Sequence, residues 1–155
     1  RHMNIRKAKS GEMGRVRELF EAYAKELNVD LCFQDFAGEM EKLPGVYAEP
    51  EGCILVLEYQ EAEIVGAVAL KKLEDSICEM KRLYIEPKFR KGGNGKKMAT
   101  AIIEEGKLKG YKTMKLDTIE RLKAAVGIYK SMGFTTTEAY NYNPEDTVLY
   151  FEKAL

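Results

Sequence analysis

The sequence predicts a single α/β domain in which helices flank a mixed central sheet. Three apolar runs rich in β-branched residues, 53–59, 64–70 and 77–85, follow one another and are typical of strands. Gly66 is expected to mark a bulge, and the polar residues 71–75 a turn. After these runs, segments with helical spacing of apolar residues alternate with further strand-like stretches. The 155 residues suffice for one domain with its own core.

We expect the elements in the order β-α-α-β-β-β-α-β-α-β-β. Ser10 can cap the first helix, which continues through Leu27, and Pro44 ends the second helix. Gly110 and Gly133 close the two later helices. The expected strands are 4–9, 53–59, 64–70, 77–85, 112–118, 134–140 and 147–153, and the last three expected helices are 34–43, 94–109 and 121–132.

Composition argues against two classes of partner. The chain has 25 basic and 25 acidic residues, so it lacks an overall charge that would attract nucleic acid or an anionic membrane. It shows no secretory leader and no apolar run long enough to cross a bilayer. Cys32, Cys53 and Cys78 are odd in number and widely spaced, which predicts free thiols in a reducing cytoplasm. We therefore expect a cytoplasmic protein, and a homodimer is left open.

His2 is the only histidine, and Arg1-His2 before Met3 is typical of the remains of an expression tag. The domain is therefore expected at 3–155. Without a native histidine, Ser-His-Asp catalysis, Cys-His catalysis and a histidine-based zinc site are excluded. The chemistry must come from carboxylates, tyrosines, lysines and the backbone, and no metal site is predicted.

A basic glycine-rich loop follows the third apolar run. Pro87 ends the strand, and Gly92, Gly93 and Gly95 let the backbone turn tightly and approach a ligand closely. The helix that follows presents free N–H groups and a partial positive charge. Additional positive charge comes from Arg90, Lys91, Lys96 and Lys97. Together these features predict a cradle for a pyrophosphate, and an ordinary turn before a helix is the alternative.

The spacing of this loop differs from two common phosphate loops. A dinucleotide loop would need a third glycine where Met98 stands, and a P-loop would need Ser or Thr where Lys97 stands. Residues 90–95 fit Arg-x-x-Gly-x-Gly instead, which resembles the coenzyme A loop of the GNAT superfamily of N-acetyltransferases. Residues 128–134, Ile-Tyr-Lys-Ser-Met-Gly-Phe, are similar to the Leu-Tyr-x-x-x-Gly-Phe segment of that superfamily. The expected order of elements also resembles the GNAT fold along nearly the whole chain.

The resemblance implies a reaction and a cofactor site. Acetyl-CoA would donate its acetyl group directly to a primary amine of a small molecule or peptide. Leu122 stands where many members have an asparagine that contacts the cofactor, which argues against cofactor contacts from residues 122–125. The implied cofactor-binding residues are Leu83, Tyr84 and Ile85 along the pantetheine arm, and Arg90, Lys91, Gly92, Gly93, Asn94, Gly95 and Lys96 in the loop.

Three side chains are candidates for acid–base chemistry. The attacking amine must be neutral, and the departing thiolate should be protonated. The resemblance implies Tyr129 as the general acid, with a core tyrosine as the alternative. It implies two candidate bases between which the sequence does not choose. Glu79 lies eleven positions before Arg90, and its alternative is a solvated edge of the strand or an ion pair with Lys81 or Lys71. Asp117 lies on the strand across the cleft, with turn capping as its alternative.

The acceptor site is expected to be aromatic and partly acidic. In the family, loops at the positions of Phe33, Tyr47, Tyr140 and Tyr142 border the cleft, and edge packing is the alternative for each residue. A catalytically idle acyl-CoA-binding sensor or partner protein is the alternative function.

Overall fold

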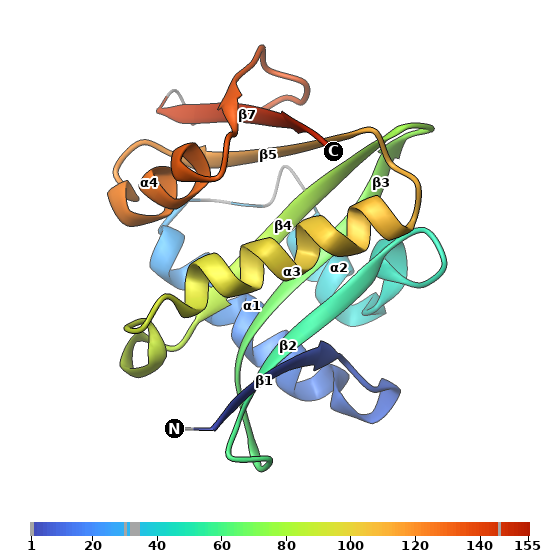
Figure 1. Ribbon diagram of the computed structural model, residues 1–155, viewed down its shortest axis with the longest axis vertical. Coiled ribbons are helices and arrows are strands. Elements are labelled where there is room, and N and C mark those ends of the chain that lie inside the picture. The colour runs from blue at the N-terminus through green and yellow to red at the C-terminus, as the bar shows by residue number, and fades with distance from the viewer. Residues whose placement is uncertain (1, 30, 32–34, 146) are drawn as a thin grey trace.

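A computed structural model describes residues 2–29, 31, 35–145 and 147–155 of the protein. The fold is a mixed sheet flanked by helices (Figure 1). The strands lie in the order β1-β2-β3-β4-β5-β7-β6, and β4 and β5 are parallel while the other described strand pairs are antiparallel. The predicted fold class is confirmed. The elements are β1 (Met3–Lys7), α1 (Met13–Leu27), α2 (Phe36–Lys42), β2 (Cys53–Tyr59), β3 (Glu63–Glu74), β4 (Ile77–Ile85), α3 (Asn94–Leu108), β5 (Thr113–Ile119), α4 (Lys123–Ser131), β6 (Thr135–Thr136) and β7 (Val148–Ala154).

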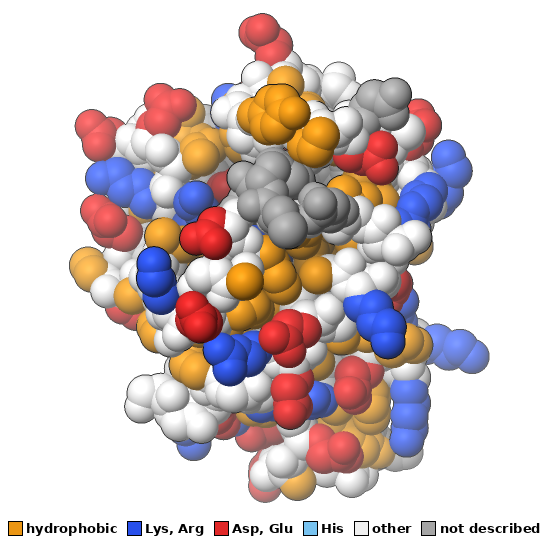
Figure 2. Space-filling model, turned by 180° about the vertical axis from the view of Figure 1, so that it is seen from behind, with side chains coloured by type: hydrophobic (Ala, Val, Ile, Leu, Met, Phe, Trp, Pro, Cys, Tyr) orange, Lys and Arg blue, Asp and Glu red, His pale blue; other side chains and the backbone are white. Residues whose placement is uncertain are grey.

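The sheet is buried on both faces because helices cover each of them. In Figure 1, α3 crosses in front of the sheet, and α1 and α2 lie behind it. Along β2, Leu55 and Leu57 pack with α3, while Ile54 and Val56 pack with α1 and α2. This two-sided burial explains why the middle strands are continuous apolar runs. Over the outer surface of the α1 and α2 side, acidic and basic side chains are interspersed (Figure 2).

The parallel strands β4 and β5 diverge after a short paired stretch. Their register runs from Ile77 only to Glu79, opposite Lys115, although both strands continue further. Just beyond, two residues of β4, Arg82 and Leu83, face one residue of β3 in a bulge, and Arg82 has φ 63°. A bulge bends the strand that carries it. The divergence opens the sheet between β4 and β5, and it positions the site described below.

Several predicted boundaries were wrong for identifiable reasons. β3 continues through Glu74 because its polar end still pairs with β4, so the turn is confined to Asp75 and Ser76. The predicted bulge is displaced from Gly66 to the preceding residue, where the β2–β3 register shifts. The first helix opens with a 3-10 turn at Ser10–Glu12, in which the Glu12 side chain accepts a hydrogen bond from the Lys9 N–H.

The strand predicted at 134–140 was also too long. β6 covers only Thr135 and Thr136, and after a last hydrogen bond from the Thr137 N–H to the Tyr150 oxygen the chain leaves β7 and runs toward the site. Within the described residues, no helix is long and apolar enough to cross a membrane.

Candidate active site

A cleft of about 720 Å³ opens where β4 and β5 diverge. Its floor is the end of β4, and its walls come from the glycine loop with the start of α3, from the C-terminal half of α1, and from α4. Of the predicted cofactor residues, those that line it are Leu83, Tyr84, Ile85, Arg90, Gly93, Gly95 and Lys96.

The other three predicted loop residues do not line this cleft. Lys91 and Gly92 are exposed, and Asn94 is buried beneath the loop. The Asn94 amide donates hydrogen bonds to the backbone oxygens of Phe89 (2.8 Å) and Lys91 (3.3 Å). Asn94 therefore fixes the shape of the loop. Gly93, at φ 76°, is the N-cap of α3, a conformation that a residue with a Cβ rarely adopts.

Arg90 is held by three contacts at the edge of the cleft. Its Nε donates to the Ile85 carbonyl oxygen at 2.7 Å, and its guanidinium lies over the Tyr84 ring, 5.2 Å from the centroid. Its two terminal nitrogens donate to the Glu26 carboxylate at 3.0 and 2.5 Å. The hydrogen bonds with Glu26 raise the pKa of Arg90. Glu26, which also lines the cleft, was missed because nothing near it in the sequence marks it as part of a site.

Tyr129 lies at the inner end of the cleft. Its side chain is buried, and its ring meets that of Phe134 edge to face, with centroids 5.9 Å apart. No group of the described residues hydrogen-bonds to its hydroxyl. Burial raises the pKa of Tyr129, so the phenol stays protonated at neutral pH. Tyr129 and Leu83 also line a second cavity of about 50 Å³, which adjoins the cleft at these shared residues.

The two candidate bases lie in different cavities. Asp117, which lies within β5 and not after it, lines the small cavity beside Tyr129. Glu79 lines a separate pocket of about 590 Å³ and is only 2% exposed, so it is not at a solvated edge of the strand. The hydroxyl of Tyr140 donates a hydrogen bond to Glu79 at 2.6 Å, and the Asn141 amide donates one to Asp117 at 3.0 Å.

The pocket that contains Glu79 lies between the sheet and α2. β3 and β4 form its floor, α2 and the turn at Gly45–Tyr47 form one wall, and Asn141 and Tyr142 form another. Lys81 lines both this pocket and the small cavity, so it lies between the two. Burial lowers the pKa of Lys81, against the opposing effect of the Glu79 charge. Phe33, which we expected here, lies outside the described residues.

Glu39, one of the carboxylates that line this pocket, belongs to a buried ion pair. Arg82, the bulge residue of β4, donates two hydrogen bonds to Glu39 of α2, at 3.1 and 2.9 Å. Tyr47 is buried in the core and donates a third to Glu39 at 2.8 Å. Burial raises the pKa of Glu39, but the hydrogen bonds and the charge of Arg82 and the hydrogen bond from Tyr47 together outweigh burial, so the net effect is a lowered pKa. The pair fixes α2 to the bulge, a connection that the sequence pattern does not indicate.

Comparison with known proteins identifies the family. Residues 15–134 match the profile of the Acetyltransferase (GNAT) family. The chain belongs to the GNAT family. An uncharacterized N-acetyltransferase of Schizosaccharomyces pombe is 38% identical over 133 residues, which are 85% of this chain and 82% of that protein.

Solved structures show the same fold. A GNAT acetyltransferase from Staphylococcus aureus superposes with a TM-score of 0.82 at 18% identity, over 99% of each chain. The PaiA N-acetyltransferase from Thermoplasma acidophilum, solved in complex with coenzyme A, gives a TM-score of 0.77 at 17% identity over 100% of each chain. The chain is thus a GNAT acetyltransferase, and its cosubstrate is acetyl-CoA.

The residues of the cleft fit this cosubstrate. Arg90 and Lys96 supply positive charge beside the N-terminus of α3, whose free N–H groups suit a phosphate. A Cβ at Gly95 would lie 3.2 Å from the Ile128 side chain, so a larger residue would press the loop against α4. Residues 122–125 also line the cleft, and the expectation that they make no contact with the cofactor stays a prediction. Leu122, which stands in place of the asparagine of many family members, gives this wall an apolar side chain.

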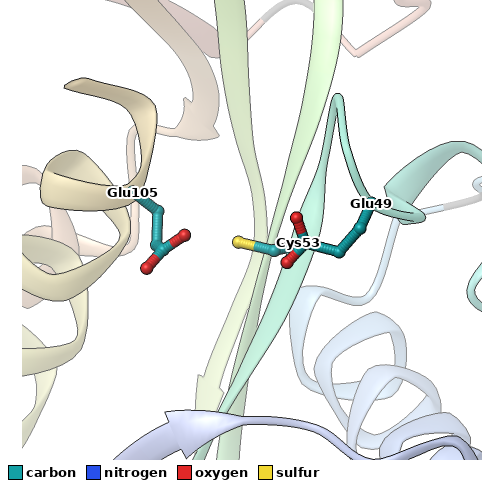
Figure 3. A group of neighbouring side chains, drawn as sticks. All are labelled: Glu49, Cys53 and Glu105. Carbon is teal, nitrogen blue, oxygen red and sulfur yellow. The ribbon is translucent and has the colours of Figure 1, made fainter. Parts of the chain in front are cut away.

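A separate group of side chains has the spacing of metal ligands. Ligand atoms of Glu49, Cys53 and Glu105 lie within 4.8 Å of one another and come from the loop before β2, from β2 and from α3 (Figure 3). Both carboxylates already contact a lysine, since Lys7 Nζ lies 2.7 Å from Glu49 and 3.6 Å from Glu105, and Lys109 also binds Glu49. Burial raises the pKa of the Cys53 thiol to about 12. These lysines and the neutral thiol make the group an ion-pair cluster.

Proposed function

We propose that the protein transfers the acetyl group of acetyl-CoA to a primary amine by direct attack, with Glu79 as the general base and Tyr129 as the general acid. The proposal rests on the arrangement of three cavities. The cofactor cleft and the small cavity share Tyr129 and Leu83, and the small cavity and the Glu79 pocket share Lys81. A donor in the cleft and an acceptor in the Glu79 pocket would therefore both lie next to the small cavity.

The residues divide the binding of acetyl-CoA between charge and apolar surface. We assign the pyrophosphate to Arg90, Lys96 and the N-terminus of α3, and the pantetheine arm to Leu83 and Ile85 of β4, which line the cleft where no β5 partner covers them. The bound cosubstrate supplies an acetyl thioester. At about 50 Å³, the small cavity beside Tyr129 has room for a group of a few heavy atoms.

The reaction requires two proton transfers, one from the attacking amine and one to the departing sulfur. A lysine-like amine has a pKa of about 10.4, so only about one in 10³ is neutral near pH 7. Glu79 lines the acceptor pocket and would take the proton of the incoming amine, directly or through water. Tyr129, kept protonated by its burial, would donate a proton to the departing sulfur. Asp117 is the competing base because it lines the small cavity itself.

Paired neutral substitutions test the assignment of the base. We expect Glu79→Gln to reduce kcat/KM at neutral pH and to recover activity as pH rises and the amine deprotonates without help. Asp117→Asn, on the neighbouring strand, is the matched variant and should keep most of its activity. If Asp117→Asn shows the pH-dependent recovery and Glu79→Gln does not, the base is Asp117. Acetyl-CoA affinity should be unchanged in both variants.

We propose that the acceptor amine belongs to a small molecule or to the end of a peptide. We also propose that the protein acts in the cytoplasm. Cys53 and Cys78 support this location because both are buried free thiols; Cys32 lies outside the described residues. An idle acyl-CoA-binding protein would bind acetyl-CoA and release no thiol with any amine, so a thiol-release assay over an amine panel separates the two functions.

A further inference from the structure

The acceptor pocket contains cations that the reaction itself does not require. Lys42, Lys71 and Lys81 all line the pocket that contains Glu79. We propose that the acceptor is an amine that carries a carboxylate within a few bonds of its nitrogen, as a free amino acid does, and that these lysines bind the carboxylate. The inference rests on the proposed function and adds the class of acceptor.

The sheet register places Glu79, the proposed base, close to Lys71 and Lys81. Lys71 of β3 lies directly opposite Glu79 of β4, so the two side chains share one face of the sheet. Lys81 is two residues along β4 and extends from the same face. Directly opposed Cβ atoms are about 5 Å apart, and residues two apart on a strand about 6–7 Å. A ligand that reaches Glu79 with its amine and a lysine with its anion must have these two groups close together.

The charges of the pocket leave room for an anion. Three carboxylates line it, but Glu39 is committed to Arg82, and Asp35 caps α2 by accepting a hydrogen bond from the Gly38 N–H. Lys42 and Lys71 form no ion pair within the described part of the chain.

Two lysine ammonium groups without an ion pair among the described residues favour a small anion. These are Lys42 and Lys71, and Glu79 lies directly opposite Lys71. A carboxylate carries one negative charge, whereas a phosphate carries about −1.5 to −2 and would be repelled more strongly by Glu79. Hydrogen bonds from an ammonium group to a carboxylate are stronger than those between neutral groups, so truncation of one lysine should have a measurable effect.

Matched acceptors provide the first part of the test. Alanine, serine, glutamate and lysine are compared with their carboxamides and with aminomethylphosphonate, and kcat/KM is measured from thiol release with acetyl-CoA. We expect the best free amino acid to exceed its own carboxamide at least tenfold. The preference would come from binding, because the amine of a carboxamide resembles a peptide α-amine with a pKa of about 8 and is more often neutral.

Lysine variants provide the second part. Lys71→Met should reduce kcat/KM for the amino acid at least tenfold and change that for the carboxamide less than about twofold. Lys72→Met is the matched control, because Lys72 is the adjacent residue of β3, points away from the pocket, and contacts Glu51 and Asp75 instead. It should leave both acceptors unchanged.

Each contrary outcome points to a different error. Equal or better turnover of the carboxamides, or of the phosphonate, would overturn the carboxylate proposal and leave the acetyltransferase intact. An amino-acid preference that survives in Lys71→Met and in the Lys42→Met variant would also overturn it. If no acceptor in the panel is acetylated although acetyl-CoA binds, the acceptor class is wrong. Failure to bind acetyl-CoA would instead refute the cofactor cleft of the proposed function.

Discussion

The hydroxyl of Tyr140 donates a hydrogen bond to the Glu79 carboxylate over 2.6 Å. The next residue, Asn141, binds Asp117, and the Tyr150 hydroxyl in turn donates to the Asn141 side-chain oxygen at 3.0 Å. The segment between β6 and β7 therefore contacts both candidate bases, on either side of the point where β4 and β5 diverge. Burial, followed by the charge of Glu79, raises the pKa of Tyr140, so this tyrosine acts as a hydrogen-bond donor at every physiological pH.

This contact predicts reduced turnover in Tyr140→Phe. The Tyr140 hydroxyl holds the Glu79 carboxylate in place, and a general base must lie within reach of the proton that it takes. Without the hydroxyl, we expect kcat/KM to fall about tenfold and acetyl-CoA affinity to stay unchanged. Tyr150→Phe is the control, because its ring packs against Tyr140 with centroids 5.3 Å apart but its hydroxyl does not reach Glu79. An unchanged kcat/KM in Tyr140→Phe would show that Glu79 does not need this contact to act as the base.

Tyr129→Phe should separate catalysis from stability. The ring and its contact with Phe134 are retained, and no hydrogen bond within the described residues is lost, so the free energy of unfolding should change by less than about 0.5 kcal/mol. Turnover should fall about 100-fold if the proton to the sulfur comes from this hydroxyl. Acetyl-CoA affinity and turnover are to be measured on the same sample.

A second tyrosine provides the control for that experiment. The Tyr111 hydroxyl donates to the Glu51 carbonyl oxygen at 2.7 Å, away from the cleft. We expect Tyr111→Phe to lose about 1 kcal/mol of stability and no turnover. Because burial raises the pKa of Tyr129, its protonated form should persist well above neutral pH, and no loss of activity due to Tyr129 is expected below about pH 10. Normal turnover in Tyr129→Phe would make it a core residue.

An ion pair far from the site predicts how stability depends on pH. Arg6 of β1 donates to both oxygens of Glu12, at 2.9 and 2.8 Å, and these hydrogen bonds lower the pKa of Glu12 from 4.5 to about 2. A carboxyl whose pKa is lower in the folded than in the unfolded state stabilises the fold above the unfolded value. That contribution is lost as pH falls through the folded value.

The window for Glu12 therefore lies between about pH 4.5 and pH 2. Since the pair is partly solvated, we expect Glu12→Gln to cost about 1 kcal/mol at pH 6 and almost nothing at pH 2. Denaturant unfolding of both proteins across this range measures the difference. Glu41→Gln, an exposed carboxylate of α2, should show no such convergence. A difference between Glu12→Gln and wild type that stays constant with pH would contradict the assignment.

The sequence predicted the parts of this molecule that depend on local pattern. Helical spacing, β-branched runs and glycine stops gave the order of elements, because each of these signals acts within a few residues. The strands 53–59 and 77–85 agree with the structure residue for residue. The glycine loop could be predicted for the same reason, since its function depends on its own backbone.

The remaining features of the site depend on contacts between distant segments. The bulge at Arg82 is fixed by Glu39, 43 residues away, and no residue near Arg82 signals a left-handed backbone there. β6 ends early because Tyr140 turns toward Glu79, at a sequence separation of 61. The sequence likewise gave no reason to place Glu79 and Asp117 in different cavities, because that separation follows from the divergence of β4 and β5.

The last prediction concerns Glu26, which accepts hydrogen bonds from the Arg90 guanidinium, the group that a pyrophosphate would need. Glu26 and Arg90 both line the cleft and form a bidentate pair. A bound phosphate would compete with Glu26 for Arg90 and would be repelled by its charge. We therefore expect Glu26→Gln to tighten coenzyme A binding by about two- to fivefold, the range of a partly exposed ion pair.

Three comparisons make this prediction specific. The gain should shrink at high salt, because the pair is about half exposed and is screened. Arg90→Ala should weaken binding, and adding Glu26→Gln to Arg90→Ala should recover much less than it gains in the wild type, because the competition for the guanidinium no longer exists. Glu18→Gln removes a carboxylate of the same helix that contacts Arg15 instead, and it should leave the affinity unchanged. Calorimetry with coenzyme A that showed weaker binding to Glu26→Gln would mean that Glu26 holds Arg90 in its binding position instead of competing for it.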